Sequence, residues 1–235
     1  MNTFKPKKNL NDSPSLEAHH LSHNYGQYQA LKETDLAIAP GEIVILNGPN
    51  GAGKTTLLLC LSGLMHPSTG QVTIEGHDLY SDEPAAKARL AFVPDVPRFY
   101  TQLTAWEHLH FIALAYGAGE GFETRAEKLL KDFGLWEGRN LFPHHYSRGM
   151  RLKLGLAMAL IRPMGVLLLD EPTSALDVDG VRLVYDTLLD LRSQGIAVLL
   201  SSHDPVLSKD LGDRFWEMRN GILEMDVQKR PMERA

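Results

Sequence analysis

A run of eight residues carries the groups needed to hold a chain of phosphates. The run fits the pattern G-x-x-x-x-G-K-S/T and, with the threonine that follows it, consists of Gly48, Pro49, Asn50, Gly51, Ala52, Gly53, Lys54, Thr55 and Thr56. Glycines here let backbone N–H groups turn inward around a phosphate, and a helix N-terminus behind them adds positive potential. Lys54 can then reach the β- and γ-phosphates, while Thr55 offers a hydroxyl to Mg²⁺. The run predicts a binding site for ATP or GTP.

Two carboxylates follow an apolar run further along the chain. Asp170 and Glu171 come directly after the apolar residues 166–169. A carboxylate at the carboxyl end of a parallel strand beside a phosphate-binding loop can hold the hydration shell of Mg²⁺, which suits Asp170. Glu171 is then placed to orient or deprotonate the water that attacks the γ-phosphate. Together with the phosphate-binding loop, the pair predicts nucleotide hydrolysis.

The segment ahead of these carboxylates resembles a family signature. Residues 146–151 read Tyr-Ser-Arg-Gly-Met-Arg and stand before Asp170 as the signature of the ATP-binding-cassette (ABC) family would. Tyr25 matches that family's adenine-stacking aromatic, and His203 matches its switch histidine. The family's D-loop is matched by Ser174, Ala175, Leu176 and Asp177. The resemblance spans about residues 16–225 and implies an ABC-type P-loop NTPase that hydrolyses ATP with Mg²⁺.

The resemblance also implies that each site is shared between two subunits. The signature residues would cap the ATP held by the opposite subunit, and they are Ser147, Arg148, Gly149 and Met150. Two such half-sites imply a head-to-tail dimer of identical or related chains. Lys54, Glu171 and His203 would act in catalysis, with His203 bonding the γ-phosphate and the attacking water. Asp177 would help to join the two sites across the interface.

Two positions depart from the family pattern. Asp95 stands at the Q-loop position, where most members have glutamine. Its carboxylate can still meet Mg²⁺ or its waters, or it only shapes the turn between Pro94 and Pro97. Arg148 replaces the glycine usually second in the signature, so its guanidinium would lie near the partner's γ-phosphate, near an acidic neighbour, or in solvent at the helix start. Both departures look like cassettes of ABC-2-type exporters, which favours export. The predicted metal ligands are thus Thr55, Asp95 and Asp170.

Alternating strands and helices must position these groups. Strand patterns are expected at 42–47, 71–75, 90–93, 166–169 and 196–200. Helical patterns fill 103–163 and return at about 181–193, with a closing helix and hairpin after the last strand. We therefore predict an α/β fold with a mainly parallel sheet flanked by helices, an N-terminal antiparallel β subdomain and a helical subdomain insertion. Residues 1–14 would form a flexible tail and 15–228 a single ABC ATPase domain, in which 15–97 and 164–228 bind nucleotide and 98–163 carry the signature.

Composition narrows the choice of partners. The net charge of −5 gives no basic field for nucleic acid. No apolar run reaches the roughly 18–20 residues of a membrane-spanning helix, so a membrane role would go through a separate transmembrane permease. We expect a cytoplasmic ATPase subunit held on the inner face of the membrane by that permease. The alternatives are a soluble ABC ATPase acting on nucleic acid, a ribosome or an assembly scaffold, and a nucleotide-bound adaptor without turnover.

Overall fold

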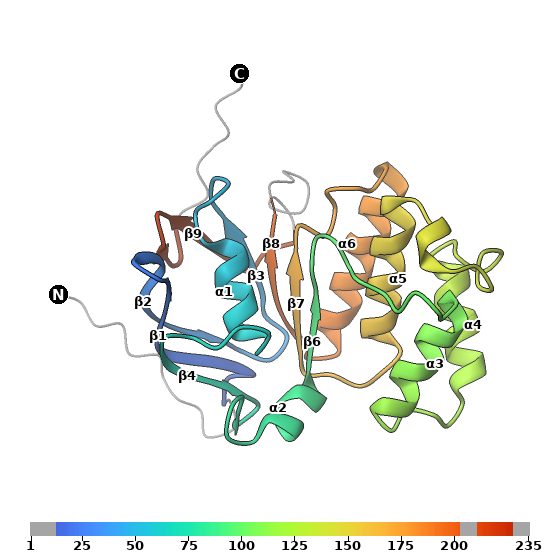
Figure 1. Cartoon of the computed structure of the whole chain (residues 1–235), viewed down its shortest axis with the longest axis horizontal. Coiled ribbons are helices and arrows are strands. Elements are labelled where there is room, and N and C mark those ends of the chain that lie inside the picture. Colours follow the sequence, from blue (N-terminus) through green and yellow to red (C-terminus); the bar gives the residue numbers. More distant parts are fainter. Residues whose placement is uncertain (1–12, 203–210, 228–235) are drawn as a thin grey trace.

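The computed structural model describes residues 13–202 and 211–227, and a six-stranded sheet lies at its centre (Figure 1). The strand order is β10-β9-β3-β8-β7-β6, with every neighbouring pair parallel except the β9–β10 hairpin. The strands are β3 (Ile43–Asn47), β6 (Leu90–Val93), β7 (Val166–Asp170), β8 (Ala197–Ser201), β9 (Arg214–Arg219) and β10 (Ile222–Glu224). The predicted mainly parallel sheet is confirmed.

A second, antiparallel sheet is built from the N-terminal part of the chain. Its order is β2-β1-β4-β5, and its strands are β1 (Leu16–Tyr25), β2 (Tyr28–Ile38), β4 (Thr69–Ile74) and β5 (His77–Asp78). The β1–β2 hairpin turns at Gly26, which has the positive φ of 59° that such a turn favours. Register shifts interrupt the pairing of β1 with both neighbours. This sheet is the expected antiparallel β subdomain.

The helices cover both faces of the central sheet. They are α1 (Lys54–Leu61), α2 (Glu83–Arg89), α3 (Ala105–Ala115), α4 (Phe122–Asp132), α5 (Arg148–Leu160) and α6 (Val178–Ser193), with a 3-10 turn η1 (Pro143–His145) before α5. Helix α1 lies between the two sheets, α5 and α6 cover the opposite face of the central sheet, and α3 and α4 lie beyond α5 (Figure 1). Within the described ranges, no helix is long and apolar enough to cross a bilayer.

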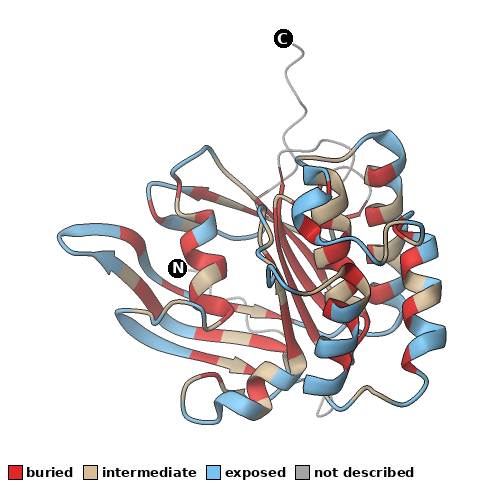
Figure 2. Ribbon diagram, turned by 45° about the vertical axis from the view of Figure 1, so that its right-hand side comes forward, coloured by how far each residue is buried: buried red, intermediate tan, exposed pale blue. Residues whose placement is uncertain are grey.

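Side-chain alternation along the central strands divides the core into two parts. Ile43 and Ile45 of β3 belong to the part of the core that includes residues of α3–α6, whereas Val44 and Leu46 belong to the part with α1 and the antiparallel sheet. Strands β7 and β8 alternate in the same way. These strands are therefore buried on both faces, as their unbroken apolar patterns predict (Figure 2). Because the sheet is packed on both faces, the residues at the ends of its strands are held in fixed positions.

Some elements differ from those expected. Helix α6 begins at Val178 rather than near 181 because the Asp177 side chain caps it, accepting a hydrogen bond from the Gly180 N–H at 2.9 Å. Helix α2 was not expected from the sequence. The expected closing helix follows β8, where residues 203–210 lie outside the described residues, as do residues 1–12 of the predicted tail.

Candidate active site

The predicted phosphate-binding loop joins the end of β3 to the start of α1. Gly48 has a φ of 149°, and a Cβ on it would lie 2.2 Å from the carbonyl oxygen of Met218 on β9. A Cβ on Gly53 would lie 2.5 Å from the Ala30 carbonyl oxygen. No side chain of the described residues caps α1, and its first turn holds no acidic residue. The loop is a close-fitting backbone cradle that opens onto a helix N-terminus, which suits an anion.

Lys54 spans this cradle with a buried side chain. Only 7% of the residue is exposed, and its ammonium donates to the carbonyl oxygens of Gly48 at 2.6 Å and Pro49 at 3.4 Å. The ammonium also lies 3.9 Å from Glu171 Oε1. The structure thus brings together the cation of the loop and the predicted base.

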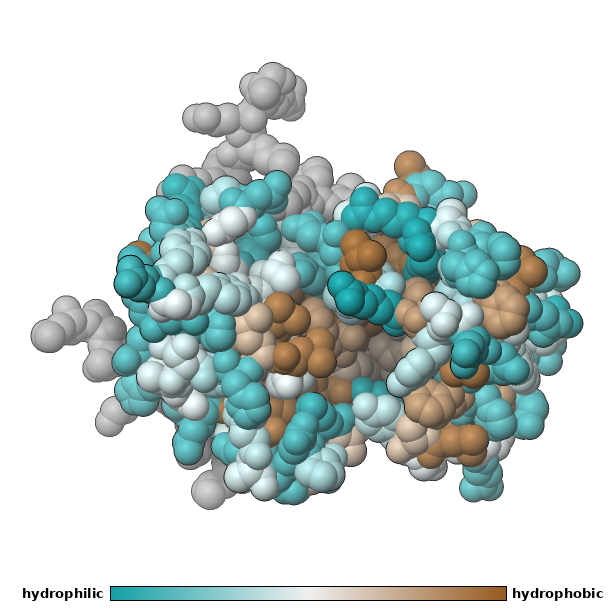
Figure 3. Space-filling view, viewed as in Figure 1, coloured by the Kyte–Doolittle hydropathy of each residue, from teal (hydrophilic) through white to brown (hydrophobic). Residues whose placement is uncertain are grey.

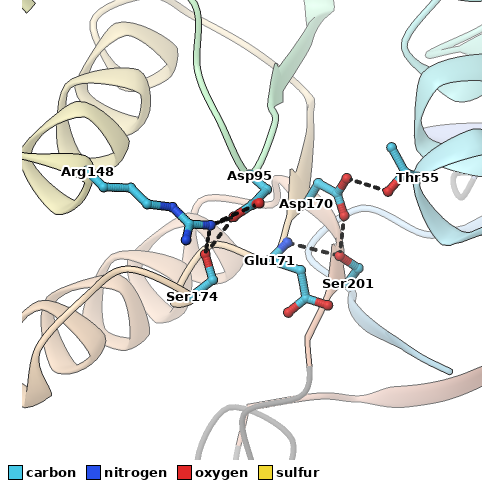
Figure 4. A network of polar contacts seen from close by, with 7 residues as sticks. All are labelled: Thr55, Asp95, Arg148, Asp170, Glu171, Ser174 and Ser201. Atoms are coloured by element: carbon cyan, nitrogen blue, oxygen red, sulfur yellow. Dashed lines mark hydrogen bonds and ion pairs between the residues drawn. The ribbon is translucent and has the colours of Figure 1, made fainter. Parts of the chain in front are cut away.

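Asp170 is held by two hydroxyl groups at the carboxyl end of β7 (Figure 4). Thr55 Oγ1 donates to its Oδ2 at 2.8 Å, and Ser201 Oγ donates to its Oδ1 at 2.6 Å. The residue is 5% exposed, so these two bonds compensate a buried carboxylate. Thr55 and Asp170 present oxygen atoms, the ligands that Mg²⁺ prefers.

Ser201 contacts both predicted carboxylate residues, and sequence reasoning missed it. It ends β8 directly opposite Asp170 in the parallel register, and it is fully buried. Besides bonding Asp170, its hydroxyl and carbonyl oxygens accept from the Glu171 backbone N–H at 2.9 Å and 3.2 Å. The available signal was a polar residue at the end of an otherwise apolar strand.

Glu171 adopts a backbone conformation that is rare outside glycine. Its φ is 48°, which costs a non-glycine residue of the order of 1 kcal/mol or more. The hydrogen bonds that the Glu171 N–H donates to Ser201 hold this turn in place. Such strain beside Lys54 and Asp170 is typical of functional sites, in agreement with the role predicted for Glu171.

The signature residues form the first turn of α5. Ser147 is its N-cap, and its Oγ accepts from the Met150 N–H at 3.1 Å. A Cβ on Gly149 would lie 2.7 Å from the Ala175 carbonyl oxygen, so only a glycine lets the helix approach the predicted D-loop this closely. The D-loop runs from Ser174 through Leu176 to the Asp177 cap of α6. Signature and D-loop are therefore in direct contact within one chain.

The two departures from the family pattern meet each other. Arg148 Nη2 donates to both carboxylate oxygens of Asp95, at 2.7 Å and 3.0 Å (Figure 4). Arg148 therefore has an acidic neighbour, one of the three placements considered from the sequence. Asp95 is bonded to Arg148 and Ser174, and its role as a metal ligand stays a prediction.

Two predicted residues lie apart from these clusters. Tyr25, at the end of β1, is 49% exposed; its ring meets that of His23 edge-on at 4.7 Å, and its hydroxyl donates to Met65 Sδ. Its role at adenine stays a prediction. His203 lies outside the described residues, directly after Ser202.

A comparison with family models decides the family. The model described as "ABC transporter" matches residues 31–174, which include the phosphate-binding loop, the signature, Asp170 and Glu171. The chain belongs to the ABC transporter family. It is an ATP-binding, ATP-hydrolysing subunit of that family.

Curated relatives of this ABC ATPase span nearly all of its length. It is 31% identical to the ABC-type transporter ATP-binding protein EcsA of Bacillus subtilis, over 86% of this chain and 82% of the relative. It is 33% identical to the SkfA peptide export ATP-binding protein SkfE of the same species, over 90% and 88%. It is also 29% identical to the arginine transport ATP-binding protein ArtM of that species, over 88% of each chain.

Solved ABC cassettes share the fold. An ATP-binding subunit of an ABC transporter superposes with a TM-score of 0.84 at 31% identity, covering 89% of each chain. A dimeric ATP-binding cassette in a post-hydrolysis state, bound to ADP and Pi, superposes at 0.80 with 27% identity, covering 91% of this chain and 99% of that one. The ABC fold predicted from the sequence is confirmed.

Proposed function

We propose that this ABC ATPase energises a separate transmembrane permease and drives export. Its catalytic core is the cluster of Lys54, Thr55, Asp170 and Glu171, and the meeting of the start of α1 with the end of β7 at these four residues carries the proposal. The subunit lies on the inner face of the membrane, held there by the permease.

The cluster divides the work of ATP hydrolysis among its members. Lys54 neutralises charge on the β- and γ-phosphates, and the backbone of the loop binds their oxygens. The hydroxyl of Thr55 and the carboxylate of Asp170 would hold Mg²⁺, with Asp95 as a further predicted contact to the ion or its waters. Mg²⁺ supplies positive charge where negative charge develops.

Glu171 is the general base of this mechanism. Its carboxylate accepts the proton of the attacking water, while Ser201 holds its backbone in position. His203 bonds the γ-phosphate and the same water. Tyr25, which is 49% exposed, stacks on adenine.

Each subunit contributes a second surface to the site of its partner. Ser147 and the N–H groups at the start of α5 face the γ-phosphate held by the opposite phosphate-binding loop. A two-fold, head-to-tail dimer then contains two ATP molecules between loop and signature. The solved dimeric cassette of the same fold supports this assembly.

An apolar surface next to Asp95 suits the permease. Four large apolar or aromatic side chains, each at least 46% exposed, lie on the loop after β6 and on helix α3. They are Val96, Tyr100, Phe111 and Leu114. The face of the molecule in Figure 3 is largely hydrophilic, with apolar side chains in its central hollow and again at the helical end. A short amphipathic helix of a permease fits such a surface. Export is supported by the likeness to a peptide export protein and by the departures at Asp95 and Arg148.

The deciding experiment uses Glu171→Gln, which keeps the size of the side chain but removes the base. Turnover should fall by about two to three orders of magnitude while ATP binding remains, because the loop and Lys54 are unchanged. The closed dimer should accumulate, and purification from membranes with ATP should capture a polytopic membrane protein at stoichiometric level. Glu123→Gln, on the exposed start of α4, should behave as wild type.

Other results would contradict particular parts of the proposal. Normal turnover in Glu171→Gln would remove the base assignment. Capture of ribosomes, nucleic acid or a scaffold in place of a permease would replace transport by a soluble mechanical role. Inside-out vesicles carrying the complex should accumulate solute from a cell extract when given ATP, and ATP-driven release instead would contradict export.

A further inference from the structure

Three loops of this chain meet in one side-chain network outside the cluster around Asp170. Arg148 Nη2 bonds both oxygens of Asp95 at 2.7 Å and 3.0 Å and also lies 3.2 Å from Ser174 Oγ. Ser174 Oγ in turn donates to Asp95 Oδ1 at 2.6 Å. Each member therefore bonds the other two, so the network is a closed triangle.

The triangle joins parts of the chain that are remote in sequence. Asp95 belongs to the loop after β6, Arg148 to the first turn of α5, and Ser174 to the turn after β7. Beside it, the backbone of α5 at Gly149 touches the Ala175 carbonyl. The network thus ties the start of the signature helix to two loops that leave the carboxyl ends of central strands (Figure 4).

We propose that Asp95 and Arg148 act as one positioning unit that sets where the signature stands relative to the phosphate-binding loop of the same subunit. The inference rests on the head-to-tail dimer of the proposed function. In a two-fold dimer, the offset between loop and signature within one subunit determines whether both shared sites can close together. A tie that fixes this offset pre-organises both sites.

This role assigns Arg148 to its own subunit rather than to the partner's phosphate. Its bonds to Asp95 use the charge of the guanidinium inside the chain, and Ser174 completes the arrangement. The two departures from the family pattern compensate each other. Asp95 without Arg148 would leave a carboxylate without its cation, and Arg148 without Asp95 would leave a guanidinium without its anion. The side chains of Arg148 and Asp95 are 52% and 36% exposed, so salt should weaken the pair.

A double-mutant cycle tests the unit on the full-length chain. Asp95→Asn and Arg148→Gln should each lower kcat about threefold to tenfold, and the double variant should be no slower than either single one. The charge-exchanged pair Asp95→Arg with Arg148→Asp should recover part of the loss. The ATP affinity of each variant, measured on the single subunit, should stay within about twofold of the wild-type value, because the phosphate-binding loop is unchanged.

Dimerisation provides a second readout that a general loss of stability would not mimic. With Glu171→Gln as the background, ATP should produce less closed dimer after Asp95→Asn or Arg148→Gln, and more again in the exchanged pair. Lys128→Gln breaks an exposed ion pair with Asp132 on α4 and serves as the matched control, with no change in kcat or dimer. Thermal unfolding of every variant reports whether the fold is kept.

Independent effects would overturn the proposal. If the two losses multiply in the double variant, or if Arg148→Gln is slow while Asp95→Asn is normal, Arg148 acts elsewhere, as on the partner's phosphate. Failure of Glu171→Gln itself to dimerise with ATP would instead contradict the head-to-tail assembly, and the kcat cycle would still decide whether the two residues are coupled.

Discussion

The cluster around Asp170 and the triangle around Asp95 both pair a cationic side chain with a carboxylate, but they differ in burial and in bonding partners. Lys54 and Asp170 are 7% and 5% exposed and are bonded by backbone carbonyls and neighbouring hydroxyls. Arg148 and Asp95 are linked through side chains that are 52% and 36% exposed. The first cluster lies at the start of α1 and the end of the buried strand β7, and its four members all belong to one chain. In the proposed dimer the second network positions a surface that faces the partner subunit, and its contacts are accessible to solvent and salt.

Removing Lys54 should give the largest effect and test the buried cluster most directly. Lys54→Ala deletes the cation at the phosphates, so we expect kcat/KM to fall by about three orders of magnitude and ATP affinity to fall strongly. Nucleotide binding and phosphate release measure the two losses. Lys87→Ala, in an exposed ion pair on α2, is the control. Unchanged ATP affinity in Lys54→Ala would contradict the assignment of the loop.

Substitution of Gly48 should show how closely the phosphate-binding loop is packed against β9. Gly48→Ala places a Cβ against the Met218 carbonyl at a φ of 149°, so the free energy of unfolding should fall by roughly 2–4 kcal/mol. Gly51→Ala meets open space and should cost only about 1 kcal/mol of backbone strain. Urea unfolding compares the two, and equal losses would mean that the cradle is looser than its contacts indicate.

Variants of the N-cap residues of α5 and α6 should affect stability and ATPase activity to different extents. Ser147→Ala and Asp177→Ala each remove a side-chain acceptor, so each should cost about 1 kcal/mol, or roughly 2–4 °C in Tm. Ser147→Thr and Asp177→Asn keep a capping oxygen and should restore Tm. We expect ATPase activity to fall further in Ser147→Ala than its Tm explains, and a proportional change would argue against contact with the partner's ATP.

Acid should weaken the helical segment by a small amount through His108. Its ring is fully buried, and its Nε2 accepts from the Tyr100 N–H at 3.0 Å while Nδ1 lies 2.7 Å from the Thr104 carbonyl oxygen. Burial lowers the pKa of His108 from its ordinary value of 6.5, although the backbone of Thr104 and the charge of Glu107 oppose the shift. As pH falls through about 6.5, His108 of the unfolded chain therefore takes up a proton before His108 of the folded chain does, and stability falls with pH until the lower pKa of the folded chain is passed.

The pH effect is measured by urea unfolding at pH 7 and pH 5.5. The uptake of one proton can change the free energy of unfolding by at most about 1.4 kcal/mol per pH unit. The decrease assigned to His108 between pH 7 and pH 5.5 should therefore be smaller than this limit allows. His108→Gln should reduce the pH dependence, whereas His144→Gln, at an exposed position, should keep it. An unchanged dependence in His108→Gln would assign the acid sensitivity to other groups.

Sequence reasoning located the central strands to within a few residues, because a strand buried on both faces must be apolar throughout. It placed α5 near Arg148 but began α6 late, since the Asp177 cap precedes the apolar pattern of that helix. It missed Ser201, whose partner Asp170 lies on a different strand. It also gave Arg148 an acidic neighbour as one choice among three without naming Asp95.

The sequence by itself determined the phosphate-binding loop, the carboxylates at 170 and 171 and the family, because these depend on residue types at short spacing. The tertiary structure alone decided which groups bond them. The parallel register of β7 and β8 brings Ser201 to Asp170, and the approach of α5 to the turn after β7 closes the triangle of Arg148, Asp95 and Ser174. Such pairings join residues far apart in the chain, and the physical reason they escape local patterns is that the packing of the sheet and helices selects them.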